Sequence, residues 1–310
     1  MKVLVACTEI GSAVSLSKVL EEKNISKFYL IGSEIVINYF STLNFDSIVI
    51  DKNQIPENID SVLLGSTLGQ SIERIFYHKK YDGVHKIAVI DSYWNIYQRF
   101  ADEITGTYWQ YVPDEIYVPN EKISKILKKY EYDGVIRIFD SPSFNTDKDK
   151  FSLFEKKYVR NKYGVTEDKQ VHIFISEYYQ KVPENWNIEV DQYNYEDIQY
   201  SINLFSEHID FLNKNKNIHI PFIKWHPTME DKFNLKLPSN LKKNQLASIS
   251  KEDLFKLGDI FVGINSMLLL EAYNRGHKTM SYMSNKMMKK NNLSKFIDNT
   301  LIIDNVNVDL

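Results

Sequence analysis

The stretch "DIFVGINSMLLLEAYNRGHKTMSYM" (259–283) contains three successive patterns that together indicate the class of fold. A short apolar run (259–266) is followed by a segment with helical spacing (267–276), and a second apolar run (278–283) comes after a glycine. Runs of about four to eight residues that are apolar on consecutive positions are typical of strands buried on both faces of a sheet. A strand, a helix and a strand in this order predict a parallel βαβ unit.

The same alternation is found along the whole chain, in two halves of similar length. Apolar runs that we interpret as strands occur at 2–8, 27–33, 46–51, 60–66, 86–91, 114–119, 170–179, 218–227, 246–250, 259–266 and 278–283. Residues 140–152 are polar, rich in turn-forming residues and nearly free of aliphatic ones, which is typical of a linker. We therefore predict an α/β fold of two doubly wound, Rossmann-like domains that face a cleft, with residues 1–150 in the first domain and 151–310 in the second.

The composition excludes several classes of protein. The 310 residues include 38 basic and 41 acidic ones, for a net charge of −3, which argues against a surface that binds nucleic acid. Cys7 is the only cysteine, so no disulfide can form within the chain, and a reducing compartment fits best. No apolar stretch approaches the roughly 18 residues that a membrane-spanning helix needs. We expect a cytoplasmic protein; a peripheral position at the inner membrane and the oligomeric state stay open.

Polar residues at the predicted strand ends are the candidate ligands, because doubly wound sheets bind ligands at the carboxyl ends of their strands. Asn265 and Ser266 precede the helix that starts near Met267, so hydroxyl and backbone N–H groups there could bind a phosphate. Glu271 lies in the next turn of an otherwise apolar helix, where a buried carboxylate needs a partner. A ribose diol and a salt bridge to Lys or Arg are the two alternatives for this partner.

The stretch "FIKWHPTMED" (222–231) brings a cation and an imidazole to the end of another predicted strand. Pro227 fixes the turn, and Lys224 lies two residues before His226 and thus on the same face of the strand. Both side chains can donate a hydrogen bond to a phosphate. If this strand is adjacent to the first strand of the opening stretch, His226 and Ser266 face a common anion pocket.

The first half has a candidate acceptor site in "IAVIDSYWNIYQRF" (87–100). Asp91 ends a predicted strand and could act as a general base, with a helix N-cap as its structural alternative. Trp94, Tyr97 and Arg99 follow it and are too large and polar for a simple core. The aromatic rings among them could stack on a sugar ring.

Two turns of the first half add further candidates. Glu9 stands beside Gly11 after the first predicted strand and is the rival base. Ser66 and Thr67, in the turn after the fourth predicted strand, could donate hydrogen bonds to sugar hydroxyls or to a carboxylate. Glycine at such turns allows the backbone to approach a ligand closely.

Two motifs resemble those of a known group of enzymes. The segment "EAYNRGHKTMSY" (271–282) is similar to the Glu-Ala-x-x-x-Gly-x-Pro segment of GT-B glycosyltransferases, in which the glutamate contacts the nucleotide ribose, although Lys278 replaces the usual proline. "KWHP" (224–227) resembles the Lys-x-His-Pro signature of bacterial sialyl-, polysialyl- and Kdo-transferase-like enzymes, which place that histidine on the phosphate of a CMP-sugar. Many retaining GT-B enzymes carry a second glutamate eight positions earlier, where this chain has Gly263, and this difference favours an inverting reaction.

The resemblance implies a metal-independent, inverting glycosyltransferase that needs no cofactor besides its donor, a nucleotide-activated sugar. A CMP-linked acidic sugar would pass to a hydroxyl of a surface glycan, a lipid-glycan or a glycoprotein. The first domain would bind this acceptor and supply the base, Asp91 or Glu9, while the second would bind the donor with His226 on its phosphate. The acceptor-binding residues would be Trp94, Tyr97 and Arg99, and the nucleotide-sugar-binding residues would be Gly11, Ser12, Ser66, Thr67, Ser176, Glu177, Lys224, Pro227, Asn265, Ser266, Met267 and Glu271.

Other functions stay open at this point. A UDP-sugar-dependent transferase, or an epimerase or hydrolase of nucleotide sugars, could use the same two domains. A non-catalytic protein that binds glycans or sugar nucleotides would keep the contacts of the second domain but tolerate the loss of Asp91. No metal-ligand spacing connects the histidines, so we expect no metal site.

Overall fold

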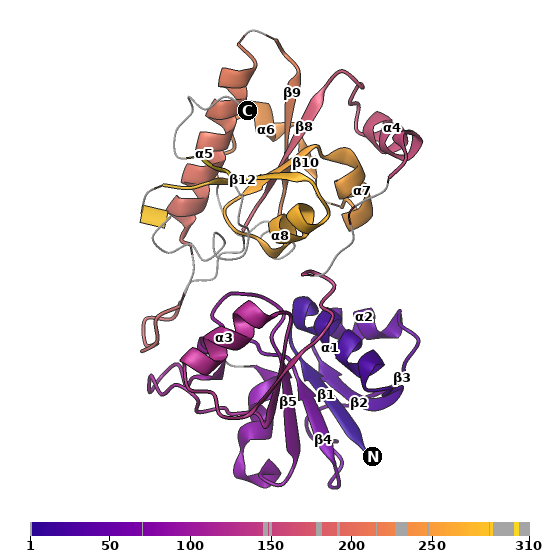
Figure 1. Ribbon diagram of the computed structural model, residues 1–310, viewed down its shortest axis with the longest axis vertical. Helices are drawn as coiled ribbons and strands as arrows, with labels where there is room; N and C mark the ends of the chain where they lie inside the picture. Colours follow the sequence, from indigo (N-terminus) through magenta and orange to yellow (C-terminus); the bar gives the residue numbers. More distant parts are fainter. Residues whose placement is uncertain are drawn as a thin grey trace. The chain divides into compact units, whose positions relative to one another are not determined.

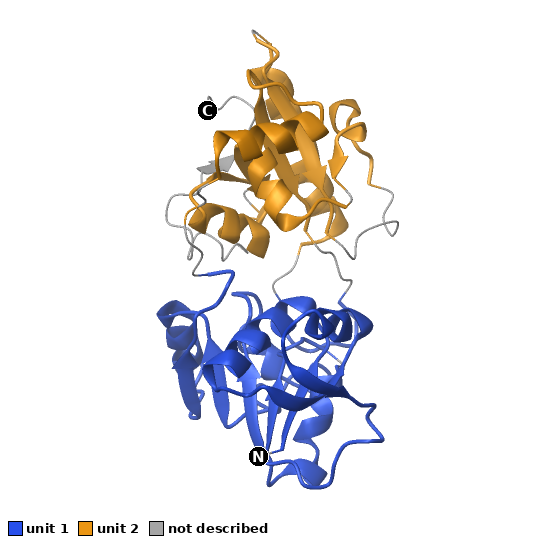
Figure 2. Cartoon of the chain, turned by 90° about the vertical axis from the view of Figure 1, so that its right-hand side faces the viewer, with its two compact units in different colours: residues 1–145, 182–191 blue, residues 146–181, 192–310 orange. Residues whose placement is uncertain are grey.

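The computed structural model describes residues 2–69, 71–144, 148, 151–177, 182–190, 193–214, 216–226, 235–246, 248–284, 286–287 and 301–303. The chain forms two compact units, shown in different colours in Figure 2. The first unit comprises Met1–Asn145 and Val182–Asp191, and the second comprises Thr146–Lys181 and Gln192–Leu310. The chain thus returns to the first unit through a short segment that the sequence pattern did not predict.

The first unit is built on a seven-stranded sheet in which every pairing is parallel. Its strands are β1 (Val3–Cys7), β2 (Lys27–Gly32), β3 (Asp46–Val49), β4 (Ser61–Leu64), β5 (His85–Val89), β6 (Glu115–Val118) and β7 (Val135–Ile138). Their order in the sheet is β3-β2-β1-β4-β5-β6-β7, so the direction of winding reverses between β1 and β4. At such a reversal the loops at the carboxyl ends separate and leave room for a ligand.

The helices of the first unit pack against this sheet (Figure 1). They are α1 (Ile10–Glu22), α2 (Glu34–Ser41) and α3 (Glu121–Lys129), with three short 3₁₀ helices, η1 (Ile72–Tyr77), η2 (Lys79–Tyr81) and η3 (Gln98–Phe100). Asn120 caps α3, because its side chain accepts a hydrogen bond from the backbone N–H of Ile123 at 3.0 Å. The sequence therefore fixes where this helix begins.

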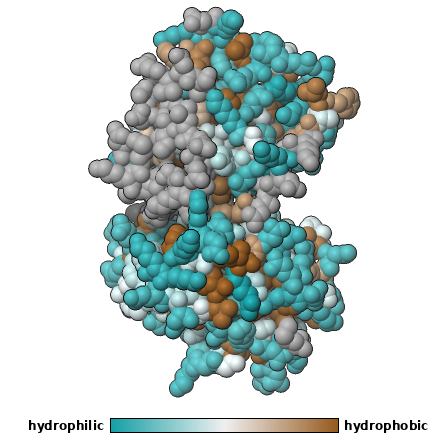
Figure 3. Space-filling view, viewed as in Figure 1, coloured by the Kyte–Doolittle hydropathy of each residue, from teal (hydrophilic) through white to brown (hydrophobic). Residues whose placement is uncertain are grey.

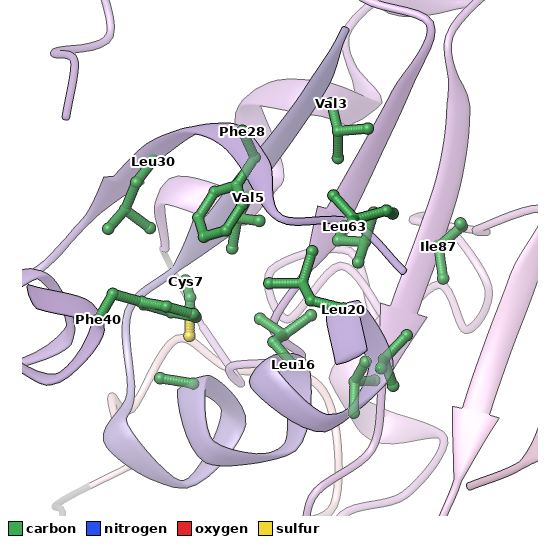
Figure 4. Close-up of a cluster of buried hydrophobic side chains, with 14 of the residues drawn as sticks. Val3, Val5, Cys7, Leu16, Leu20, Phe28, Leu30, Phe40, Leu63 and Ile87 are labelled. Carbon is green, nitrogen blue, oxygen red and sulfur yellow. The ribbon is translucent and has the colours of Figure 1, made fainter. Parts of the chain in front are cut away.

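Apolar side chains from β1, β2 and α1 meet in the core of the first unit (Figure 4). Val5, Leu16 and Phe28 belong to this cluster and are fully or almost fully buried. Cys7 lies in the same cluster, and burial raises the pKa of its thiol well above the usual value. Its role is that of a small apolar side chain, as its apolar sequence context indicates.

The second unit repeats the architecture with a six-stranded parallel sheet. Its strands are β8 (Gln170–Ile175), β9 (His219–Lys224), β10 (Gln245–Leu246), β11 (Ile260–Gly263), β12 (Lys278–Tyr282) and β13 (Leu301–Ile303), in the order β10-β9-β8-β11-β12-β13. Its helices are α4 (Leu153–Lys162), α5 (Tyr195–Leu212), α6 (Ser239–Lys242), α7 (Lys251–Leu257) and α8 (Met267–Asn274). The prediction of an α/β protein with two doubly wound, Rossmann-like domains is thereby confirmed.

Capping boxes start two helices of the second unit. Ser152 and Glu155 exchange side-chain and backbone hydrogen bonds at the start of α4, and Asn194 and Asp197 do the same at α5. Each pair satisfies two N–H groups that a helix start would otherwise leave unpaired. Polar residues flanking an apolar pattern therefore define these helix boundaries.

The described residues on the face that Figure 3 shows are mostly hydrophilic. Some of the most exposed large apolar side chains of the described chain lie on α4, where Leu153 is 87% and Phe154 78% exposed. Only Val159 of this helix is buried. The described residues include no helix with the length and apolar character that crossing a bilayer requires.

A histidine cluster lies in the interior of the second unit. The His172 side chain is completely buried, and its Nε2 lies 2.9 Å from Nδ1 of His219. His208, on α5, lies near this pair, and its Nδ1 lies 2.7 Å from the hydroxyl of Tyr282 in β12. Desolvation, followed by the positive charge that His219 would carry, lowers the pKa of His172 to about 3, so this imidazole is neutral in the folded protein at physiological pH.

Acid should destabilise the protein through His172. Its pKa in the folded state lies below the value of about 6.5 expected in the unfolded chain, so its contribution to stability is complete above that pH and is lost as the pH falls towards 3. The free energy of unfolding should fall by up to about 1.4 kcal/mol per pH unit in this window on account of this group. Urea unfolding between about pH 7.5 and pH 5 measures the slope.

The variant His172→Gln is the matched comparison, because it keeps a hydrogen-bonding side chain but cannot take up the proton. Its unfolding free energy should fall less steeply with pH than that of the wild type. Equal slopes for the two proteins would show that His172 does not carry the acid sensitivity.

Candidate functional site

The carboxyl end of the first sheet holds a buried ion pair between Asp91, which follows β5, and Arg99 in η3. Arg99 Nη1 lies 2.8 Å from Asp91 Oδ1, and both side chains are only 9% exposed. Ser12 near the start of α1 donates a further hydrogen bond to Asp91 Oδ2 at 3.2 Å. Both carboxylate oxygens of Asp91 are therefore occupied within the first unit, and Asp91 is not a helix N-cap.

Arg99 connects the turns after β4 and β5. Its Nη1 also donates to the carbonyl and the hydroxyl of Ser66, at 2.9 and 3.0 Å, and its Nε donates to the carbonyl of Trp94 at 3.1 Å. Nη2 donates to the hydroxyl of Ser92. The Ser66 hydroxyl itself donates to the carbonyl of Val89 at 2.6 Å. The structure thus brings Asp91, Arg99 and Ser66 together, but as one internal network in which they satisfy each other.

Glycine is required where α1 begins. A Cβ atom on Gly11 would lie 2.6 Å from Asp91 Oδ2, which is closer than such atoms can approach. Gly11 therefore lets the start of the helix lie directly beside the Asp91 carboxylate. We predicted that the backbone at this turn approaches a ligand closely. In the structure, the group that it approaches is the Asp91 side chain.

Glu9 differs from Asp91 in its surroundings. It occupies the N-cap position of α1, its side chain makes no capping hydrogen bond, and it is exposed. Partial desolvation and then the negative charge of Asp91 raise the pKa of Glu9, while the Arg99 guanidinium opposes the increase. An exposed carboxylate with a raised pKa has the properties of a general base.

Glu73 in η1 is a buried acid that the sequence analysis missed. Its carboxylate accepts hydrogen bonds from the backbone N–H and the hydroxyl of Thr8, at 2.9 and 2.7 Å, and from the hydroxyl of Thr67 at 3.1 Å. A Cβ atom on Gly65 would lie 2.7 Å from the same carboxylate. Thr67 thus contacts Glu73, whose neighbours in the sequence, Ile72 and Arg74, do not indicate that its carboxylate is buried.

Tyr97 lies in an aromatic stack. Its ring lies 3.7 Å from that of Tyr130, with an interplanar angle of 20°, and 5.3 Å from that of Tyr108. One face of Tyr97 is therefore covered by the first unit itself. Trp94 is half-buried and packs against Tyr93 with a centroid distance of 5.1 Å.

In the second unit, β8 lies between β9 and β11. Ile175 is in register with Lys224 on one side and with Gly263 on the other, so all three strands end at the same level. The strand that precedes His226 is therefore not adjacent to the one that precedes Ser266, so the adjacency that we set as the condition for a common anion pocket is not met. Both ends still lie on the same edge, separated by about two strand spacings, or roughly 10 Å between backbones.

The residues that follow β8 fill the space between these two ends. Ser176 is buried, and its backbone N–H donates to the carbonyl of Lys224 at 2.9 Å. Glu177 Oε1 accepts a hydrogen bond from the backbone N–H of Asn265 at 2.9 Å. The amide group of Asn265 in turn donates to the hydroxyl of Tyr193 at 2.7 Å. The start of α8 is thus connected to the middle strand through the Glu177 carboxylate.

Burial raises the pKa of Glu177 to about 7. The backbone N–H groups of Asn265, Ser266 and Ile264 counteract this increase, since they stabilise the charged form. The N–H groups at the start of α8 thus bind a carboxylate, which is the interaction that the sequence predicts for a phosphate.

Residues at the end of β11 and at the start of α8 have structural roles of their own. The Ser266 hydroxyl caps the helix by accepting from the backbone N–H of Leu268 at 3.3 Å. Met267, the first helical residue, is half-buried. A Cβ atom on Gly263 would lie 2.9 Å from the carbonyl of Ile175, so glycine is needed there for close strand pairing.

The partner of Glu271 is a pair of cations. Lys251 Nζ lies 3.0 Å from Oε2, and Arg275 Nε and Nη2 lie 3.1 and 2.9 Å from Oε1, while Glu271 itself is only 3% exposed. Of the two alternatives that the sequence left open, the salt bridge is the one present. It compensates the buried charge, and breaking it would leave a carboxylate unpaired.

Lys224 is the last residue of β9, His226 follows two residues later, and both are half-buried. Burial, and then the positive charge of Lys224, lowers the pKa of His226 to about 4. The imidazole is therefore neutral at pH 7 and can offer one N–H group to an anion. Pro227, which the sequence predicts to fix the turn after this strand, lies outside the described residues.

No three His, Cys, Asp or Glu side chains are arranged as metal ligands among the residues that the structure describes. The polar groups at the described strand ends are hydrogen-bond donors and carboxylates. Phosphate binding, proton transfer and hydroxyl recognition are the chemistry that such groups can perform.

Comparison with known proteins gives structural matches alone. Neither a family model nor a curated protein matches the chain. A glycosyltransferase from Rickettsia africae matches 99% of this chain and 85% of its own, with 11% identity and a TM-score of 0.58. HepE from Anabaena in complex with UDP-glucose matches 98% of this chain and 86% of its own, with 8% identity and a TM-score of 0.57.

The wall teichoic acid polymerase TagF, soaked with CDPG, covers 98% of this chain over 76% of its own length, with 9% identity and a TM-score of 0.55. At these identities the likeness concerns the fold. The chain has the GT-B fold that these solved structures share, with two doubly wound domains in succession.

Proposed function

We propose that the protein is a metal-independent, inverting glycosyltransferase that moves a sugar from a nucleotide donor to a hydroxyl group. One observation carries the proposal: the backbone N–H groups of residues 264–266, in the turn that leads into α8, stabilise the carboxylate of Glu177. A turn whose N–H groups bind one anion can bind another of similar size, such as a donor phosphate. The GT-B fold of solved glycosyltransferases supports the same conclusion.

The second unit would bind the donor. Ser266 and the N–H groups of residues 264–266 would contact the phosphate, with His226 and Lys224 approaching from the end of β9. These donors would stabilise the negative charge that develops on the departing phosphate. The Lys-x-His-Pro resemblance favours a CMP-linked acidic sugar.

A UDP-sugar is the second candidate donor. HepE, whose fold this chain shares, was solved with UDP-glucose. The same N–H groups would serve a diphosphate, because they recognise phosphate oxygens and make no contact that depends on the base.

The first unit would bind the acceptor and supply the base. Glu9 suits this role better than Asp91, because Asp91 is already bound by Arg99 and Ser12. Asp91 would act as a positioning residue that raises the pKa of Glu9 through its charge. The acceptor would be a hydroxyl of a surface glycan, a lipid-glycan or a glycoprotein.

Titration calorimetry with CMP, UDP and GDP tests the donor site. We expect CMP to bind most tightly, and we expect His226→Ala to weaken its binding by at least about tenfold, since one hydrogen bond to a charged phosphate is lost. The variant His85→Ala, which changes a half-exposed histidine of the first unit, should bind CMP like the wild type. A preference for UDP would favour the second candidate donor, and binding of none of the three nucleotides would contradict the proposed function.

A further inference from the structure

Glu177 holds the position that the proposed function gives to a donor phosphate. Its Oε1 lies 2.9 Å from the backbone nitrogen of Asn265, and the N–H groups of Ile264 and Ser266 also stabilise its charge. These three N–H groups lie in the turn between β11 and α8, one to three residues before the first helical residue, Met267, and successive backbone N–H groups in a turn can bind an anion. Within the described residues the donor site therefore already contains a negative charge of the protein itself.

The helix does not need Glu177 as its cap. The Ser266 hydroxyl already accepts the N–H group of Leu268 at 3.3 Å, which is the ordinary N-cap interaction of α8. The carboxylate of Glu177 comes from another strand, 88 residues away in the sequence. The N–H groups that Glu177 binds precede the helix, so this carboxylate is not part of the N-cap of α8.

We propose, on the basis of the proposed function, that Glu177 is a displaceable stand-in for the donor phosphate and sets how tightly that phosphate binds. A phosphate oxygen and a carboxylate oxygen cannot accept from the same N–H group, and two anions in contact repel each other. The donor must therefore displace Glu177 or bind when this residue carries a proton. In either case the carboxylate competes with the phosphate and weakens its binding.

Protonation of Glu177 is available near neutral pH, since burial raises its pKa to about 7. Lys224, the last residue of the neighbouring strand β9, and His226, two residues later, lie on one side of Glu177. The hydroxyl of Tyr193 contacts Asn265. His226, with its pKa lowered to about 4, stays neutral between pH 6 and 8. Competition by Glu177 should therefore weaken as the pH falls from 8 to 6, and it is this carboxyl group that titrates.

The charged groups further along α8 do not change in the same window. Glu271 is paired with Lys251 of α7 and Arg275 of its own helix. These three side chains form one ion-paired group that does not include Glu177. Substitutions of Glu177 leave this group intact.

Calorimetry with CMP at about pH 8 tests the proposal. Glu177→Gln keeps the shape of the side chain and removes its charge, so CMP should bind about tenfold more tightly than to the wild type. Glu177→Ala should give an equal or larger gain. Cytidine, which lacks the phosphate, should bind all three proteins alike.

The pH dependence separates competition from a structural effect. At about pH 6 the ratio of CMP dissociation constants between wild type and Glu177→Gln should approach one, because wild-type Glu177 is then mostly protonated. Titration of CMP itself cancels in this ratio. Glu167→Gln, which changes an exposed glutamate paired with Lys157, is the control and should bind CMP like the wild type at both pH values.

Unchanged or weaker CMP binding in both Glu177 variants would overturn the proposal and leave the proposed function standing. A gain of equal size for cytidine would also overturn it, since the effect would then not concern the phosphate. If neither the wild type nor any variant binds a nucleotide, the proposed function fails together with the inference.

Discussion

Glu9→Gln should lower the turnover of sugar transfer by about 10²- to 10⁴-fold, the usual contribution of a general base. Glutamine has the shape of glutamate but cannot accept the proton of the acceptor hydroxyl. The exposed position of Glu9 and its raised pKa support this role. The measurement is the rate of product formation with saturating donor and a glycan acceptor, with CMP binding by calorimetry expected to stay unchanged.

Asp91→Asn is the matched control for Glu9→Gln. It removes the charge that pairs with Arg99, so it should lower the stability of the protein as well as its activity, whereas Glu9→Gln should lower activity alone. Full turnover in Glu9→Gln together with its loss in Asp91→Asn would identify Asp91 as the base. Full turnover in both variants would favour a protein that binds its ligand without catalysis.

The pH profile gives a second measurement of the same assignment. A base acts in its deprotonated form, so activity is lost as the pH falls through its pKa. Because the pKa of Glu9 is raised, this loss should begin at a higher pH than for an ordinary glutamate. An acid limb in the usual carboxylate range would argue against Glu9.

The central strands of both sheets and the edge strand β3 could be predicted from the sequence, whereas the edge strand β7 could not. The residues of β1 and β4 are buried on both faces, so each leaves a continuous apolar run. β7 lies at an edge, and its Val135 and Ile138 are about half exposed, so "VIRI" does not differ from a loop in pattern. The strand predicted at 246–250 is β10, which has only two residues, Gln245–Leu246. A short and partly solvated strand gives too few apolar positions for its presence or its bounds to be recognised.

The location of the candidate residues could be predicted more easily than their partners. Parallel strands end at one edge, so residues that follow them, such as Glu177 and Asn265, are bound to lie near each other. Which of them pair depends on side chains distant in the sequence, as for Glu271 and Lys251. The salt bridge at Glu271 and the contact between Glu177 and Asn265 were therefore visible only in three dimensions.

Arg99→Ala should lower the free energy of unfolding by about 3–5 kcal/mol, the usual effect of removing one partner of a buried ion pair. The substitution leaves the Asp91 carboxylate without its cation and the carbonyl groups of Ser66 and Trp94 without their donor. Arg99→Lys should recover only part of the loss, because an ammonium group cannot donate in all these directions at once. Urea unfolding measures all three proteins.

The double variant Arg99→Ala/Asp91→Asn distinguishes the physical causes of this loss. If the unpaired carboxylate is the main cause, removing its charge should recover part of the stability, so that the double variant is more stable than Arg99→Ala alone. Lys27→Ala removes an exposed lysine that pairs with the exposed Asp46, and it should leave stability nearly unchanged. An Arg99→Ala protein as stable as Lys27→Ala would mean that the network does not hold the strand ends of the first unit. Asp91 would then be free of Arg99, and the argument that favours Glu9 as the base would lose its support.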